Sequence, residues 1–228
     1  MKTPHTALLL VGSPKPGASS SASLGTYLLE ELEQLGLHTD TVNLTKALRS
    51  GGATESLHAA VAAADLVVLS FPLYIDSLPA PVIRALELIA ARRAGLSPAA
   101  AGDKPALVAI CQCGFPEAEH NEVALEICRN FAPAAGFEWA GGLGMGGGGM
   151  ASRRPLREIR GMLRSAVHAL DLTAAELAAG RPVPGEAVRL MAKPAIPGFA
   201  YRFVANRQWR GELKKQGATA PLDARPFG

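Results

Sequence analysis

Short apolar runs alternate with stretches of helical periodicity along most of the chain, and this alternation limits the fold more than any other feature of the sequence. Five runs predict strands, at residues 6–11, 39–44, 66–70, 105–111 and 137–145. The stretches between and after them carry apolar residues at helical spacing and predict helices, at residues 24–35, 56–63, 78–93, 121–132 and 153–179. Regular alternation of strand and helix predicts a parallel sheet covered by helices on both faces. We therefore expect an α/β protein.

The number of strands and the right-handed connections between them leave few topologies. For five strands the natural choice is a flavodoxin-like three-layer α/β/α fold, with a five-stranded parallel sheet of order 2-1-3-4-5. Ligands of such sheets bind beyond the carboxyl ends of the strands, at the switch point beside the first strand. The loops at residues 12–23, 71–77 and 112–119 are therefore expected to converge on one crevice.

A change of composition near residue 180 predicts the end of this domain. Residues 180–185 are rich in glycine and proline, so we expect a domain at 1–180 and an extension at 181–228 that packs on the core or on a partner subunit. Residues 186–228 hold eight basic and three acidic residues, a net charge of +5, whereas the whole chain carries +3. The extension is also aromatic, and its prolines exclude one long helix. It predicts a basic surface that is either a solvated face or a binding face.

Several classes of protein are disfavoured by the composition. A net charge of +3 does not by itself imply nucleic acid, and no apolar run approaches the ~20 residues of a membrane span. The helical projection of residues 199–213 is not cleanly amphipathic, which also disfavours binding to a membrane surface. Cys111, Cys113 and Cys128 have neither disulfide nor zinc spacing, and the five histidines are scattered. We expect a reduced, cytoplasmic protein without a metal site.

The loop that follows the first strand carries the features of a phosphate site. It leads from a strand into a helix, whose N-terminus offers unpaired N–H groups and a partial positive charge. Its candidate ligands are hydroxyl groups and one cation, namely Ser13, Lys15, Ser19, Ser20 and Ser21. One serine is enough to cap a helix. Three in a row, together with Ser13, predict phosphate binding, although capping alone is the alternative.

Two other nucleotide-binding motifs, the Walker A loop and the dinucleotide-binding pattern, are matched only in part. Gly12 and Gly17 have the spacing of a Walker A loop, but Ala18 stands where that motif requires lysine. Gly142, Gly144 and Gly147 spell the dinucleotide-binding pattern, but no strand with an acidic end follows about 20 residues later. The glycine run 146–149 is interpreted instead as a permissive turn.

The loop after the third strand places apolar and aromatic groups beside the predicted phosphate site. Its candidate binding residues are Pro72, Leu73, Tyr74 and Ile75. A flat heteroaromatic ring needs apolar walls of this kind, with backbone groups for its edges. The alternative is an ordinary strand-to-helix turn in which Tyr74 packs on the core.

With these motifs the chain resembles the NAD(P)H-dependent FMN reductases and related flavodoxin-like oxidoreductases. The resemblance rests on residues 12–24, 64–80 and 113–117 and on a tail pattern that includes Tyr201, Trp209 and Lys215. It implies that Ser13, Ser19, Ser20 and Ser21 hold the phosphate of FMN, and that Lys15 matches a basic position. It further implies that the second loop lines the ribityl chain and the isoalloxazine, and that Cys113, Gly114 and Phe115 contact the ring. The cysteine cluster of iron–sulfur relatives is missing.

The resemblance implies an oxidoreductase in which hydride passes from NAD(P)H to FMN and electrons pass on to a quinone, a flavin or a similar small acceptor. In such enzymes the cofactor carries the difficult step, so the lack of a catalytic triad is no obstacle. An FMN-binding electron carrier that does not use NAD(P)H is the alternative, and an interaction module without flavin is a third. Flavodoxin-type carriers are strongly acidic as a family, and the mild basicity of this chain favours the enzyme. A homodimer is expected from the resemblance.

Overall fold

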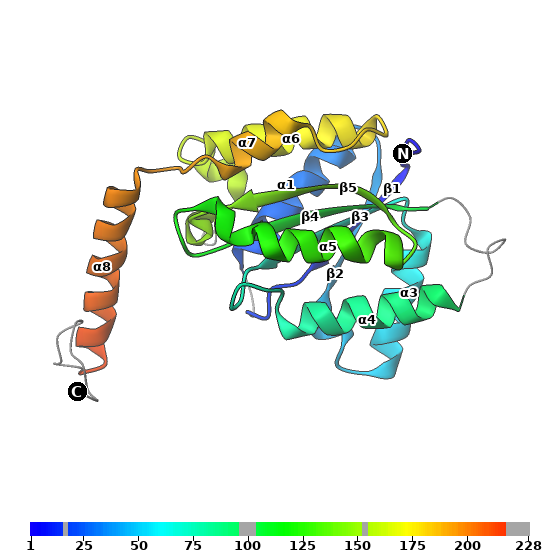
Figure 1. Ribbon diagram of the computed structural model, residues 1–228, viewed down its shortest axis with the longest axis horizontal. Helices are drawn as coiled ribbons and strands as arrows, with labels where there is room; N and C mark the ends of the chain where they lie inside the picture. Colours follow the sequence, from blue (N-terminus) through cyan, green and yellow to red (C-terminus); the bar gives the residue numbers. More distant parts are fainter. Residues whose placement is uncertain (16–17, 96–103, 152–154, 218–228) are drawn as a thin grey trace. The chain divides into compact units, whose positions relative to one another are not determined.

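The computed structural model describes residues 1–15, 18–95, 104–151 and 155–217, and its centre is a parallel β-sheet (Figure 1). The strands are β1 (Thr6–Val11), β2 (His38–Asn43), β3 (Leu66–Pro72), β4 (Ala106–Gln112) and β5 (Glu138–Met145). They lie in the order β2-β1-β3-β4-β5, and each neighbouring pair is parallel. The predicted α/β class, the five strands and the flavodoxin-like order are confirmed.

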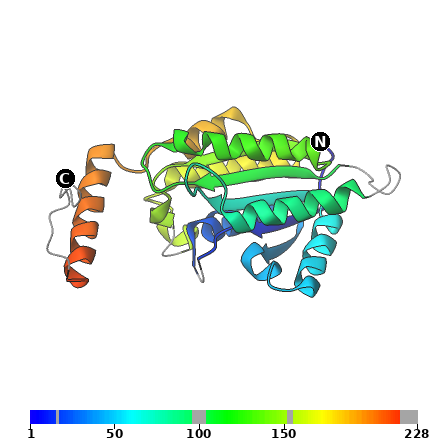
Figure 2. The same ribbon diagram turned by 60° about the horizontal axis from the view of Figure 1, so that its bottom comes forward.

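Helices connect the strands and cover both faces of the sheet (Figures 1 and 2). They are α1 (Ser20–Gln34), α2 (Leu44–Ala47), α3 (Gly51–Ala63), α4 (Ala80–Ala94), α5 (Glu122–Ala134), α6 (Arg164–Ala178) and α7 (Gly185–Ala192). A further helix, α8 (Gly198–Lys215), belongs to a separate unit of the chain. Short 3₁₀ helices lie at Ala118–Asn121, Gly148–Ala151 and Leu156–Ile159.

The continuous helix expected at residues 153–179 is wrong in its first part. Leu156–Ile159 forms a 3₁₀ helix, and the α-helix begins only at Arg164. Pro155 has no N–H to donate, and Gly161 is a poor helix former, so the periodic apolar residues there do not make one helix. Residues 152–154 of the expected helix lie outside the described residues.

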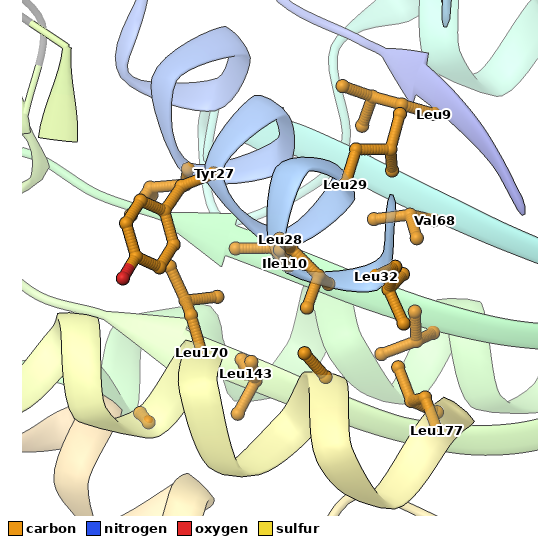
Figure 3. Close-up of a cluster of buried hydrophobic side chains, with 14 of the residues drawn as sticks. Leu9, Tyr27, Leu28, Leu29, Leu32, Val68, Ile110, Leu143, Leu170 and Leu177 are labelled. Atoms are coloured by element: carbon orange, nitrogen blue, oxygen red, sulfur yellow. The ribbon is translucent and has the colours of Figure 1, made fainter. Parts of the chain in front are cut away.

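Alternate residues of the strands form two cores, one on each face of the sheet. Leu9, Val68 and Ile110 face α1 and α6, where they meet Leu28 and Leu170 (Figure 3). Their neighbours in sequence belong to the second core, under α3, α4 and α5, and include Leu8, Leu10, Val67, Leu69 and Phe71. Strands buried on both faces read as continuous apolar runs, which explains why they were visible in the sequence.

The first part of the expected extension packs on the sheet. Val183 N–H donates to the Ala140 carbonyl at 2.8 Å, and Ala187 and Met191 of α7 are buried in the first core. One compact unit therefore covers Met1–Ala195, and a second covers Ile196–Gly228. The domain division expected at residue 180 stays a prediction. Among the described residues, none of the helices combines the length and apolarity needed to cross a bilayer.

A short tether holds the beginnings of β1 and β3 together. Asp65 Oδ2 accepts hydrogen bonds from the backbone N–H groups of His5 at 2.9 Å and Thr6 at 3.1 Å. Partial burial alone would raise the pKa of Asp65, but the hydrogen bonds from His5 and Thr6 stabilise the carboxylate and bring the pKa below its usual value. The ionised carboxylate therefore stabilises the fold.

The first core should be sensitive to the removal of methyl groups from α1. Leu28→Ala, at a fully buried position, should lower the free energy of unfolding by about 2–5 kcal/mol. Leu35→Ala is the matched control, because Leu35 follows the same helix and is 53% exposed, and it should cost less than about 0.5 kcal/mol. Urea denaturation followed by circular dichroism measures both, and equal losses would contradict the assignment of this core.

The Asp65 tether should give a pH-dependent contribution to stability. Because the pKa is depressed in the folded state, the stabilisation is present above about pH 4 and is lost as the pH falls through the folded-state value. The gap in thermal midpoint between the wild type and Asp65→Asn should therefore narrow between pH 7 and pH 3. Asp40→Asn, on the exposed edge strand β2, should shift the midpoint little at either pH. A gap that widens in acid would contradict this account.

Candidate functional site

The three loops predicted to converge begin side by side at the carboxyl edge of the sheet. Gly12 N–H donates to the Ser70 carbonyl at 2.8 Å, which joins the first loop to the end of β3. Leu73 N–H donates to the Gln112 carbonyl at 2.8 Å, which joins the second loop to the end of β4. The order of the strands thus places all three loops at one edge, as the sequence predicted.

The serine cluster of the first loop surrounds the N-terminus of α1. Ser19 is the N-cap, and its Oγ accepts a hydrogen bond from Ala22 N–H at 3.1 Å. Ser13 Oγ accepts from Lys15 N–H at 3.3 Å. Ser13, Ser19, Ser20 and Ser21 are buried, whereas Lys15 is exposed. Ser19 therefore caps α1. Capping does not account for Ser13, Ser20 and Ser21, because the helix needs only one N-cap residue.

Ser21 supplies the observation that favours an anion at this helix start. Its hydroxyl is fully buried and lacks a hydrogen-bond partner among the described residues. A buried, unpaired hydroxyl is costly unless a further group satisfies it. The first turn of α1 also holds no acidic residue, although acidic residues are favoured there. An anionic phosphate at this point would meet the N–H groups of the first turn and satisfy the cluster, so these residues fit the phosphate of FMN.

The close approach of α1 to the sheet depends on a glycine. A Cβ on Gly25 would lie 2.5 Å from Leu9 Cδ1 and 3.2 Å from Ser70 Cβ. Ser70, itself fully buried, donates through its Oγ to the Ser21 carbonyl at 2.8 Å. The first turn of α1 is therefore bonded to β3 and the second turn lies close against β1, and these contacts were not predicted from the sequence.

The second loop presents Tyr74 and Ile75, but not Pro72 and Leu73, to solvent. Pro72 ends β3 and is buried, Leu73 is half-buried, and Tyr74 and Ile75 are 48% and 99% exposed. The alternative in which Tyr74 packs on the core is therefore wrong. Tyr74 and Ser77 close a tight turn by two backbone hydrogen bonds of 2.9 and 3.1 Å.

The third loop turns Cys113 inward and Phe115 outward. The Cys113 side chain is 3% exposed and lies within 3.5 Å of the Phe115 carbonyl and 3.4 Å of the Glu117 carbonyl. Burial raises the pKa of this thiol, which disfavours the reactive thiolate. Gly114 is exposed, and Phe115 is 55% exposed with its ring 4.5 Å from that of His120. Contact of Cys113, Gly114 and Phe115 with a flavin ring stays a prediction.

Asn121 holds the third loop in place, and the sequence did not predict this role. It is fully buried at the start of α5, and its Nδ2 donates to the Ala118 carbonyl at 2.9 Å and the Met145 carbonyl at 3.3 Å. The side chain thereby ties the loop after β4 to the end of β5. A single asparagine between a loop and a helix is typical of an ordinary helix cap, so nothing in the sequence pointed to a role in holding two loops together.

The glycine run after β5 is a packing surface as well as a turn. Gly147 N–H donates to the Phe115 carbonyl at 2.6 Å, and Gly148 N–H donates to the Cys113 carbonyl at 2.9 Å. A Cβ on Gly146 would lie 2.2 Å from the Pro116 carbonyl oxygen. The run therefore lets two loops lie backbone against backbone, which the interpretation as a permissive turn did not include.

Solved structures share this fold at low sequence identity. An FMN-dependent NADH-azoreductase from Bacillus anthracis, in complex with FMN, is 13% identical with a TM-score of 0.54, and the match covers 76% of this chain and 99% of that one. An NADH:FMN oxidoreductase (EMOB) in its apo form is 15% identical with a TM-score of 0.56, over 85% and 96% of the two chains. An NAD(P)H:quinone oxidoreductase from Methanothermobacter marburgensis is 15% identical with a TM-score of 0.55, over 77% and 96%.

The sequence itself identifies the family. No curated protein matches it. The family described as NADPH-dependent FMN reductase matches residues 6–182, which is the region that carries the sheet, the serine cluster and all three loops. The chain therefore belongs to the NADPH-dependent FMN reductase family and is an NAD(P)H-dependent oxidoreductase that uses FMN, with NAD(P)H as its electron donor.

Proposed function

We propose that this oxidoreductase passes electrons from NAD(P)H by way of FMN to a quinone, a free flavin or a similar small acceptor. The observation that carries the proposal is the start of α1, where a buried serine cluster includes an unpaired hydroxyl. The second observation is the pair of exposed apolar loops at the same edge of the sheet. The first suits the phosphate of FMN, and the second suits its ring and a flat acceptor.

Each loop has its own part in this proposal. Residues of the first loop hold the phosphate, namely Ser13, Lys15, Ser19, Ser20 and Ser21. Residues of the second loop line the ribityl chain and the ring, namely Pro72, Leu73, Tyr74 and Ile75. Residues of the third loop would contact the ring, namely Cys113, Gly114 and Phe115, and Asn121 would keep that loop in place.

The chemistry itself belongs to the cofactor. When bound, FMN would supply the hydride and electron chemistry that links the nicotinamide to the acceptor. The three loops would bind and orient the partners, and the proposal requires no proton transfer by a side chain. Burial of the Cys113 thiol agrees with a part in packing rather than in catalysis.

The alternative of an electron carrier that does not use NAD(P)H is set aside by membership of the reductase family.

We further propose a cytoplasmic homodimer. All three cysteines are buried and free, which suits a reducing compartment. The proposed extension 181–228 then divides into a part that packs on the sheet, up to Ala195, and the unit that contains α8.

The proposed reaction is tested by steady-state oxidation of NADPH. The purified protein loaded with FMN should oxidise NADPH continuously when a quinone is present, and the FMN-free protein should not. Flavin reduction by NADPH and NADH that is too slow to support turnover would contradict the proposal.

The phosphate site is tested by a charge placed at the cap of α1. Aspartate caps a helix about as well as serine, so Ser19→Asp should preserve α1 while it repels the phosphate. We expect the Kd for FMN to rise at least tenfold. Ser50→Asp is the matched control, because Ser50 caps α3 in the same way, with its Oγ 3.3 Å from Ala53 N. It should leave the Kd unchanged, and an equal effect of the two variants in a fluorescence titration would refute the assigned site.

A further inference from the structure

The tight turn of the second loop has a backbone conformation that its residues do not favour. Ile75 and Asp76 have φ values of 51° and 53°, and both belong to the left-handed region. Two-residue turns with this geometry are normally formed by Asn-Gly or similar pairs. A β-branched side chain is among the least suited to it, because its Cβ crowds the backbone. The turn is therefore strained, and the hydrogen bonds between Tyr74 and Ser77 hold it closed.

The strain is not compensated by burial of the Ile75 side chain. Ile75 is 99% exposed, the largest exposed fraction among the large hydrophobic residues that the structure describes. An isoleucine that packed into the core could offset the strain by leaving water, but this one lies in solvent and packs on none of the residues that the structure describes. Strained residues of this kind cluster at ligand clamps, where the strained geometry is needed.

The position of the turn in the fold indicates its function. Ile75 lies three residues beyond Pro72, the last residue of β3, and so at the carboxyl edge of the sheet, where the first loop also begins. Tyr74 and Phe115, 48% and 55% exposed, add apolar surface from the same pair of loops. These loops begin side by side, since Leu73 N–H donates to the Gln112 carbonyl at 2.8 Å. An apolar side chain held in solvent here is exposed to a molecule that approaches this edge of the sheet.

We propose that Ile75 is a specificity-determining residue that contacts the electron acceptor and selects apolar, planar acceptors of the quinone class over small hydrophilic anions. The inference rests on the proposed function and adds the substrate class to it. The turn holds the isoleucine side chain in solvent, so beyond the contact with FMN proposed above it has apolar surface that an acceptor can bury. Discrimination by one such apolar contact amounts to roughly 10- to 200-fold, and a side chain at an exposed position belongs at the low end of this range.

The experiment compares two substitutions within the same turn. Ile75→Asn removes the apolar side chain and places a residue that tolerates the left-handed region. Asp76→Gly relieves strain at the neighbouring residue and keeps Ile75. The readout is the ratio of kcat/KM for menadione, an apolar quinone, to kcat/KM for ferricyanide, a hydrophilic anion, with the FMN-loaded protein. We expect the ratio to fall at least fivefold in Ile75→Asn and to stay within twofold of the wild type in Asp76→Gly, while both variants unfold at higher temperature.

Three results would overturn the assignment. The ratio could stay the same in Ile75→Asn, it could fall equally in Asp76→Gly, or light scattering could show that Ile75→Asn lowers the oligomeric mass. The second result would assign the effect to the turn backbone, and the third would assign Ile75 to a contact with a second copy. Reduction of the flavin by NADPH in the wild type is recorded in the same experiment. Its absence would refute the proposed function, whereas normal reduction with an unchanged ratio would refute only the role of Ile75.

Discussion

The contact between the first two turns of α1 and the strands β1 and β3 is the interaction on which the rest of the site depends. Gly25 lets the helix come within reach of Leu9, and Ser70 holds the Ser21 carbonyl at 2.8 Å. The helix N-terminus is thereby aimed at the carboxyl edge of the sheet, where the second and third loops also begin. A phosphate bound there would fix one end of a long cofactor, and the apolar loops would then receive its ring.

The rigidity of this arrangement comes from groups that do not touch a ligand. Asn121 and the glycine run after β5 join the third loop to the end of the sheet through backbone carbonyl groups. In contrast, the turn of the second loop is closed by the two backbone hydrogen bonds between Tyr74 and Ser77, and it carries Tyr74 and Ile75 into solvent. The third loop is thus supported by its neighbours, while the second loop displays side chains that can contact an incoming molecule.

The sequence predicted the parts of this structure that have a periodic apolar pattern or a cluster of one residue type. The buried strands were visible because Leu8, Leu9 and Leu10 are all apolar, and the serine cluster was visible because serines follow one another at a strand-to-helix junction. Asn121 and Ser70 were not, because their roles depend on carbonyl groups that the fold brings from other strands. The helix expected from residue 153 failed because apolar periodicity continued through a region where Pro155 and Gly161 disfavour the α-helix. The left-handed turn at Ile75 and Asp76 was not predicted, because such turns are normally formed by other residues, such as Asn-Gly.

The central claim is that the start of α1 grips the phosphate of the flavin, and the most direct test compares two ligands that differ only in that group. FMN and riboflavin share the ring and the ribityl chain, and riboflavin lacks the phosphate. Isothermal titration of the wild-type protein should give a Kd for FMN at least 100-fold below that for riboflavin, with the difference shrinking as the salt concentration rises. Equal affinities for the two flavins would contradict the account.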